Sequence, residues 1–168
     1  LNLLSSHDVA RALSVVGEDE SSLVLATLLL FTYPGAPSIY YGDEVGLPGE
    51  LDPDSRRTFP SEKDWNQPLL KLHKELINLR HHHPALRTGG YEVLHAADQT
   101  YVFARTLNLD RMIVAVNTAE MTPVSLATQE LIDENASLKP LFTHGEVTCK
   151  KGKVSLPPRS GVICTVES

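Results

Sequence analysis

The hydrophobic pattern of the sequence changes once, near Pro84, and this change limits the folds open to the chain. Before Pro84, short strand-like runs alternate with helical stretches, an order typical of parallel strands joined through helices. After Pro84 the helical period disappears, and short runs follow one another at hairpin spacing. We therefore predict an α/β part over residues 1–84 and an all-β part over residues 85–168.

The first two predicted helices follow each other closely. Residues 9–16 are expected to form a short helix, with Asp8 as a candidate N-cap and Gly17 as the residue after its C-cap. Acidic residues 18–20 then start a second helix, because negative charge suits the positive end of the helix dipole. The body of this helix reads LVLATLLLF and is apolar on nearly every side, so we expect it to be buried on more than one face.

A third helix and two strands complete the α/β part. Residues 1–4 are interpreted as the end of a buried strand and the run SIYY at 38–41 as a second strand. A helix is expected from about Gln67 to His82, where one stripe contains Leu69, Leu72, Leu76 and Leu79. This order suits an open βαβ layer or part of a (β/α) barrel.

Residues 85–168 contain short runs separated by turn residues. In the last run Val162, Cys164 and Val166 occupy alternate positions, a period of two that is typical of a strand. Close spacing and hairpin-length turns predict an antiparallel β-sandwich.

Charge and hydropathy exclude several classes of partner. The formal net charge is −6 with no basic stripe, so we expect no nucleic-acid partner. The longest apolar stretch, residues 23–31, is far shorter than the ~20 residues of a membrane-spanning helix, so we expect no membrane partner and a cytoplasmic location. Cys149 and Cys164 lack metal-ligand spacing; they suit buried free thiols, with pairing across neighbouring strands as the alternative.

His7 and Asp8 are the first candidates for chemistry. They follow the first predicted strand directly, and in a (β/α) barrel the catalytic groups lie where strands end. The alternative is that Asp8 only caps the next helix and His7 is a polar loop residue.

A second cluster, DPDSRR, lies in the loop after SIYY. Asp52 and Arg56 are four residues apart across a turn that contains proline, and the arginine fork can hold a carboxylate or donate to hydroxyl groups. The alternative is a surface turn with a local ion pair.

Three further features have structural interpretations. The paired acids of the GDE sequence at 42–44 suit acid–base chemistry or the binding of a cation, and the structural alternative is that Asp43 or Glu44 is buried against an arginine. Three consecutive histidines, His81, His82 and His83, point in different directions on a helix, so they are not expected to share a metal ion. Their place in the last helical turn suits a favourable interaction with the helix C-terminus. The rings of Tyr40, Tyr41, Phe59 and Trp65 are candidate platforms for sugar faces, with core packing as the default for Tyr40 and Tyr41.

In this order the motifs resemble the α-amylase superfamily of glycoside hydrolases. LNLLSSHD is similar to the region where a strand of the catalytic barrel ends in His-Asp, and YPGAPSIYYGDEVGL to the segment ending in the last barrel strand. DPDSRRTFP and the following helix resemble the loop and final helix of the cyclomaltodextrinase, neopullulanase and maltogenic amylase branch. LPPRSGVICTV is similar to the final strand of the family's C-terminal β-domain. The fold implied is the last strands and helices of a (β/α)8 barrel plus a C-terminal antiparallel β-sandwich domain.

The resemblance also implies roles for individual residues. Asp8 matches the third catalytic carboxylate, which stabilises the transition state, and His7 matches a histidine that binds the sugar. Asp52 and Arg56 match a substrate-binding pair, with Asp54 and Arg57 as weaker candidates. The substrate implied is an α-glucan oligosaccharide, cleaved at α-1,4-glucosidic bonds with retention of configuration. No cofactor is implied; calcium is compatible with the family, but no cluster here indicates it.

One departure from the family limits the function of this chain. No residue here matches the nucleophile or the acid/base, so we expect a C-terminal fragment that is inactive alone. The alternatives are a non-catalytic carbohydrate-binding or scaffolding module, and a family member that lost its catalytic residues. A fragment that starts at a barrel strand would expose a strand edge, so self-association is a further expectation.

Overall fold

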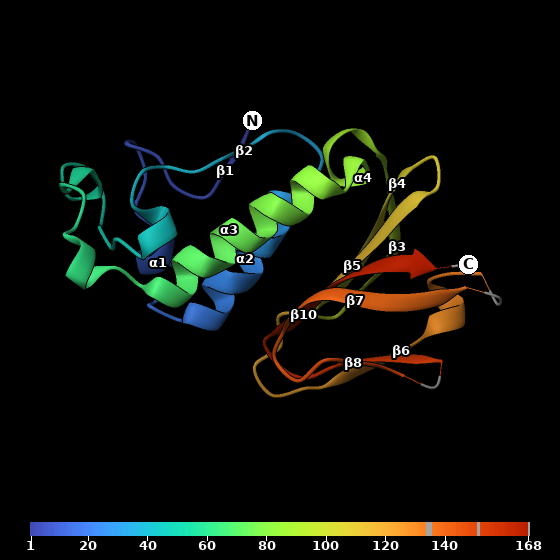
Figure 1. Ribbon diagram of the computed structural model, residues 1–168. Helices are drawn as coiled ribbons and strands as arrows, with labels where there is room; N and C mark the ends of the chain where they lie inside the picture. The colour runs from blue at the N-terminus through green and yellow to red at the C-terminus, as the bar shows by residue number, and fades with distance from the viewer. Residues whose placement is uncertain (134–135, 151, 168) are drawn as a thin grey trace. The chain divides into compact units, whose positions relative to one another are not determined.

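The computed structural model describes residues 1–133, 136–150 and 152–167 (Figure 1). They form two compact units, Leu1–His82 and His83–Ser168. Helices and one short parallel sheet make up the first unit, and antiparallel sheets make up most of the second. The predicted order, α/β followed by all-β, is confirmed.

The first unit begins with a β–α–α–β arrangement. Strand β1 (Asn2–Leu3) pairs in parallel with β2 (Pro37–Ser38), and helices α1 (Ala12–Val15) and α2 (Glu20–Thr32) lie between them in the chain. Three short 3-10 helices follow, before the long helix α3 (Gln67–His82). Their bounds are Asp43–Val45 for η1, Asp54–Arg56 for η2 and Glu62–Asp64 for η3.

Helix α2 begins where its sequence indicates. Asp19 is the N-cap, and its carboxylate accepts from the backbone N–H groups of Ser21 and Ser22 at 3.1 and 3.3 Å. The apolar body is buried on more than one face, as predicted; its buried residues include Leu23, Leu25, Leu28, Leu30 and Phe31.

Helix α3 packs through one face, as its leucine stripe predicted. Leu69, Leu72, Leu76 and Leu79 are all buried. The same helix is joined to the end of α2 by Arg80, which donates to the carbonyl oxygen of Phe31 at 2.7 Å. His73 also packs its ring against that of Phe31, edge to face at 5.9 Å.

The structure corrects the expected start of α1. The helix begins at Ala12, and its N-cap is Arg11, not Asp8. The hydroxyl of Ser5 accepts from the Ala12 N–H at 2.9 Å, so the capping bond comes from a residue outside the helix. The C-terminal end was predicted correctly, because Gly17 has a φ of 66° and occupies the left-handed position after the C-cap.

The expected strands of the first unit are also shorter than predicted. Leu1 and Leu3 are exposed, so residues 1–4 are not a buried strand end. Strand β2 ends at Ser38, so Tyr40 and Tyr41 lie outside it. Both tyrosine rings contact the guanidinium of Arg11 instead.

The second unit contains two antiparallel sheets. The five-stranded sheet has the order β3-β4-β5-β10-β7 and the three-stranded sheet the order β6-β9-β8. Their strands have these bounds: β3 Gly90–Ala97, β4 Thr100–Leu107, β5 Asp110–Asn117, β6 Val124–Ala127, β7 Ser137–His144, β8 Thr148–Lys150, β9 Lys153–Leu156 and β10 Ser160–Glu167. A buried cluster between them, including Val102, Ile113, Leu126, Val154 and Leu156, forms the core of the predicted β-sandwich.

One helix of the second unit was not predicted. Pro84 starts helix α4 (Pro84–Thr88), because proline is well suited to the first turn of a helix. The carboxylate of Asp110 accepts from the Ala85 N–H at 2.9 Å and contacts His83 Nδ1 at 3.0 Å. The start of α4 is therefore held by a side chain from β5, a contact that local sequence does not reveal.

Candidate functional site

His7 and Asp8 lie in an exposed turn between β1 and α1. The His7 Nε2 atom is 3.2 Å from the Asp8 Oδ2 atom, and the two side chains are 63% and 70% exposed. The Asp8 backbone N–H donates to the Ser6 hydroxyl at 3.1 Å, which shapes the turn. Because Asp8 does not cap α1, the capping interpretation of this carboxylate is wrong, and its oxygens face solvent where a ligand can reach them.

The loop around η2 meets this turn. Arg56 Nε is 2.9 Å from the Asp52 carboxylate and 3.3 Å from the carbonyl oxygen of His7. The Ser55 hydroxyl donates to the same carbonyl oxygen at 3.3 Å. The two motifs that the sequence singled out separately, His7-Asp8 and Asp52–Arg56, are therefore neighbours in the first unit.

The second acid–arginine pair of this loop differs from the first. Arg57 donates to both carboxylate oxygens of Asp54, at 2.7 and 2.8 Å, and the Glu50 N–H donates to Asp54 Oδ2 at 2.7 Å. These hydrogen bonds, the one from Arg57 most of all, lower the pKa of Asp54. All its strong contacts are within the loop, so Asp54 maintains the shape of the turn.

A buried arginine, Arg11, which no sequence motif marked, contacts the loop of the site through its side chain. The Arg11 side chain is fully buried, and its Nε atom donates to the carbonyl oxygen of Ser55 at 2.8 Å. Its Nη1 atom is 3.3 Å from the Asp43 carboxylate and also donates to the carbonyl oxygen of Tyr41. Arg11 thus connects the segment after Asp8 to the loop that contains Ser55.

The aromatic residues beside Arg11 have a packing role. The centre of its guanidinium lies 4.1 Å from the centroid of the Tyr40 ring and 4.6 Å from that of Tyr41, a cation–π arrangement. Phe59 and Trp65 pack edge to face on each other at 5.8 Å. Tyr40 and Trp65 are half-buried, whereas Tyr41 and Phe59 are exposed, so the core-packing interpretation does not hold for Tyr41.

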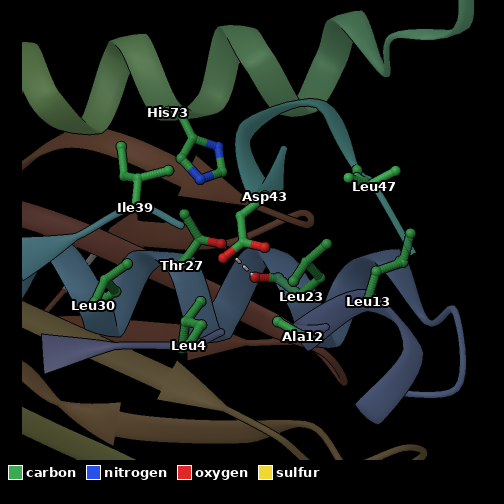
Figure 2. Close-up of a pocket in the computed structure, with 11 residues that line it drawn as sticks. Leu4, Ala12, Leu13, Leu23, Thr27, Leu30, Ile39, Asp43, Leu47 and His73 are labelled. Atoms are coloured by element: carbon green, nitrogen blue, oxygen red, sulfur yellow. Dashed lines mark hydrogen bonds between the residues drawn. The ribbon is translucent and has the colours of Figure 1, made fainter. Parts of the chain in front are cut away.

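Asp43 is the acid of the GDE sequence that lies buried against an arginine, as one interpretation predicted. Burial raises its pKa, while the Ser5 hydroxyl and the Arg11 guanidinium oppose that rise. Figure 2 shows Asp43, His73 and Thr27 close together among leucine side chains, lining a cavity of about 10 Å³. A space of this size holds at most about one water molecule, so no sugar binds there.

Two of the three consecutive histidines, His82 and His83, have structural contacts. His82 Nδ1 contacts the carbonyl oxygen of Asn78 at 2.9 Å, and His83 contacts Asp110 as described above. Within residues 1–133, 136–150 and 152–167, no three His, Cys, Asp or Glu side chains gather as a metal ion requires. None of the described helices is both long enough and apolar enough to cross a membrane.

Comparison with known families accounts for most of the chain. Residues 1–63 match the family described as alpha amylase, catalytic domain, and residues 89–160 match the alpha-amylase C-terminal domain. The chain belongs to the α-amylase family. The predicted fold class is confirmed by these two matches, which follow each other in the order that the resemblance implied.

Named relatives come from the predicted branch of the α-amylase family. Neopullulanase 2 of Thermoactinomyces vulgaris is 39% identical over 168 residues, covering 96% of this chain and 28% of that protein. A cyclomaltodextrinase of Bacillus sp is 40% identical over 119 residues, covering 69% of this chain and 21% of that protein. The chain therefore spans less than a third of the length of these relatives.

Solved structures agree with this assignment. The debranching enzyme of Nostoc punctiforme superposes with a TM-score of 0.83 at 46% identity, covering 98% of this chain and 35% of that one. An α-amylase of Geobacillus thermoleovorans complexed with acarbose gives a TM-score of 0.83 at 25% identity, with coverage of 99% and 38%. Both similarities extend across the two units of this chain.

Proposed function

We propose that this chain is the C-terminal part of a retaining glycosidase that cleaves α-1,4-glucosidic bonds in cyclodextrins, pullulan or maltooligosaccharides. Membership of the α-amylase family supports the reaction class, and relatives named neopullulanase and cyclomaltodextrinase support the substrates. The observation that carries the proposal is the position of Arg56, whose Nε contacts both the Asp52 carboxylate and the carbonyl oxygen of His7.

In this proposal Asp8 stabilises the transition state. Its carboxylate is exposed beside His7 and accepts hydrogen bonds from ring hydroxyls of the sugar at the cleavage point. Those bonds strengthen as the sugar takes on oxocarbenium character, so they lower the barrier as well as aiding binding. His7 donates to the same sugar, and its position next to Asp8 lets one ring contact both groups.

Asp52 and Arg56 bind the neighbouring part of the substrate. Both side chains are about half exposed, 53% and 50%, so a glucan can reach their polar atoms. Arg56 uses Nε for its contacts with Asp52 and His7, which leaves the two terminal nitrogens of its fork for sugar hydroxyls.

The two carboxylates that break the bond lie outside these 168 residues. A retaining glycosidase needs a nucleophile and an acid/base about 5–5.5 Å apart, and neither matches a residue here. The 168 residues alone therefore have no hydrolytic activity. We also propose a cytoplasmic location, in keeping with a Bacillus subtilis relative named intracellular maltogenic amylase.

Self-association of the isolated chain is a further part of the proposal. Strand β1 has β2 as its partner in a two-stranded sheet, and Leu1 and Leu3 are exposed beside it. Exposed apolar residues on a short strand favour pairing with another copy. Sedimentation of the 168-residue chain is expected to show concentration-dependent oligomers, and a single monomer species at all concentrations would contradict this.

The function is tested by comparing the full-length protein with residues 1–168. Each is incubated with β-cyclodextrin, pullulan, maltotriose and a branched glucan, and released reducing ends are measured. We expect turnover by the full-length protein with retained anomeric configuration, and none by residues 1–168. Binding without turnover by the full-length protein would favour the non-catalytic module, and turnover by residues 1–168 would contradict the absence of the working carboxylates.

A further inference from the structure

The two cysteines of the chain meet across the β-sandwich of the second unit. Cys149 lies on β8 in the three-stranded sheet, and Cys164 lies on β10 in the five-stranded sheet (Figure 1). Their Sγ atoms are 3.9 Å apart, and both are free thiols. They are the only two cysteines among the 168 residues, so their contact across two sheets is specific.

The two thiols differ in their surroundings. Cys164 is 1% exposed and lies in the core, opposite Ile113 on β5 and Pro140 on β7. Cys149 is partly buried, lies opposite Val154 on β9 and packs against the same core. Because β8 is an edge strand of its sheet, Cys149 is the thiol that solutes in water reach first.

We propose that Cys149 and Cys164 are a modification site, at which a small disulfide such as oxidised glutathione drives formation of a reversible disulfide between the two sheets. The sulfur atoms must approach from 3.9 Å to about 2.05 Å. Side-chain rotation with a small shift of a three-residue edge strand supplies that movement.

The reaction proceeds in two exchange steps. The Cys149 thiolate attacks one sulfur of the oxidant, forms a mixed disulfide and releases the first small thiolate. The Cys164 sulfur then attacks the Cys149 sulfur of the mixed disulfide, the bond between Cys149 and the small thiol breaks, and the Cys164 proton passes to the departing sulfur, which leaves as the second small thiol. In total two protein thiols are oxidised and one small disulfide is reduced to two thiols.

The electrostatics of the pair favour Cys149 as the first nucleophile. The Cys149 and Cys164 sulfur atoms share a hydrogen bond, and this bond lowers the pKa of Cys149. The same bond, together with burial in the core, raises the pKa of Cys164. Cys149, the less buried of the two, is therefore the more reactive thiol, and the buried Cys164 is placed to resolve the mixed disulfide.

Formation of the disulfide would oppose separation of the two sheets of the second unit. The bond would tie β8 to β10 and restrict the unfolded chain between residues 149 and 164. Hydrogen exchange of the β8 and β10 amides is therefore expected to slow in the oxidised protein, by about 10-fold or more where exchange requires the sheets to separate.

The test uses the full-length protein incubated with oxidised glutathione and then digested with trypsin. Trypsin cleaves after Lys150 and Arg159, so the two cysteines fall in separate peptides unless a disulfide joins them. We expect a linked peptide pair that is lighter than its reduced components by two hydrogens, about 2 Da, and that dithiothreitol separates.

Two variants complete the test. Cys149→Ser is expected to leave Cys164 unmodified, because the remaining thiol is buried. Cys164→Ala is expected to stop at a stable mixed disulfide of Cys149 with glutathione. The proposal is overturned if both cysteines of the wild-type protein are still free thiols after incubation with oxidised glutathione. It is also overturned if the wild-type protein stops at the mixed disulfide.

Discussion

Arg56 donates through its Nε atom to the carbonyl oxygen of His7 at 3.3 Å, across 49 positions of the chain. The same atom contacts the Asp52 carboxylate at 2.9 Å. One side chain thus fixes the η2 loop beside the turn that contains His7 and Asp8. Because the contact with His7 is made to its backbone, the His7 and Asp8 side chains remain directed to solvent.

Replacing Asp8 with asparagine in the full-length protein is expected to lower kcat by at least about 100-fold, because a charge that acts in the transition state is lost. KM should change little, since the interaction is weaker in the ground state. Steady-state kinetics on maltotriose provide the measurement, with the exposed Glu18→Gln as a matched control. Turnover within a few-fold of wild type would refute the role given to Asp8.

Changes to the exposed Asp52–Arg56 pair should affect binding more than stability. Asp52→Asn and Arg56→Gln are each expected to raise KM about 10-fold, because a charged hydrogen bond to substrate is lost. The free energy of unfolding should fall by less than about 1 kcal/mol, since the pair is half exposed. The control is Lys139→Gln, which removes an exposed pair with Glu167 in the second unit. Unchanged KM values would contradict the substrate role.

Loss of the buried Arg11 should destabilise the first unit. Arg11→Met leaves the Asp43 carboxylate buried without its partner, which is expected to cost about 3–5 kcal/mol of unfolding free energy at pH 7. Adding Asp43→Asn should recover part of that loss, because the uncompensated charge is gone. Urea unfolding measures both, and the exposed Lys71→Met is the control. A double variant as unstable as Arg11→Met would argue against the ion pair as the cause.

Asp54 is expected to titrate below its ordinary pKa of 3.8, because Arg57 and the Glu50 N–H stabilise its ionised form. A group with a lowered pKa in the folded state contributes stability above its unfolded pKa, and this stability is lost as the pH falls through the folded pKa. The loop should therefore loosen only below about pH 3.8. NMR titration of the carboxyl carbon measures the midpoint. Arg57→Gln should move it towards 3.8, and an unmoved midpoint would contradict this cause.

Several elements could be predicted because their signals are local. The leucine stripe defined α3, and the acidic start with an apolar body defined α2, where the Asp19 cap is two and three residues from the N–H groups it accepts from. The period of two in β10 defined a strand. In each case the residues that decide the element lie within a few positions of one another.

The start of α1, the helix α4 and the strand β8 could not be predicted in this way. The first N–H of α1 is bonded by Ser5, and the start of α4 is held by Asp110, 25 positions away from Ala85. Neither partner is marked by hydrophobic periodicity. The sequence predicted only that Asp43 or Glu44 would be buried against an arginine. It did not identify Arg11 as that arginine.

By itself the sequence determined the succession of an α/β part and a β-sandwich, the limits of α3, and the motifs that contain His7, Asp8, Asp52 and Arg56. Only the tertiary structure decided that Ser5 and not Asp8 bonds the first N–H of α1, that Arg11 is buried and bonded to the loop that contains Ser55, and that Cys149 meets Cys164 across two sheets. The physical reason is that periodicity and capping are short-range properties of the chain. Contacts such as Arg56 with His7 depend on how segments far apart in sequence pack together.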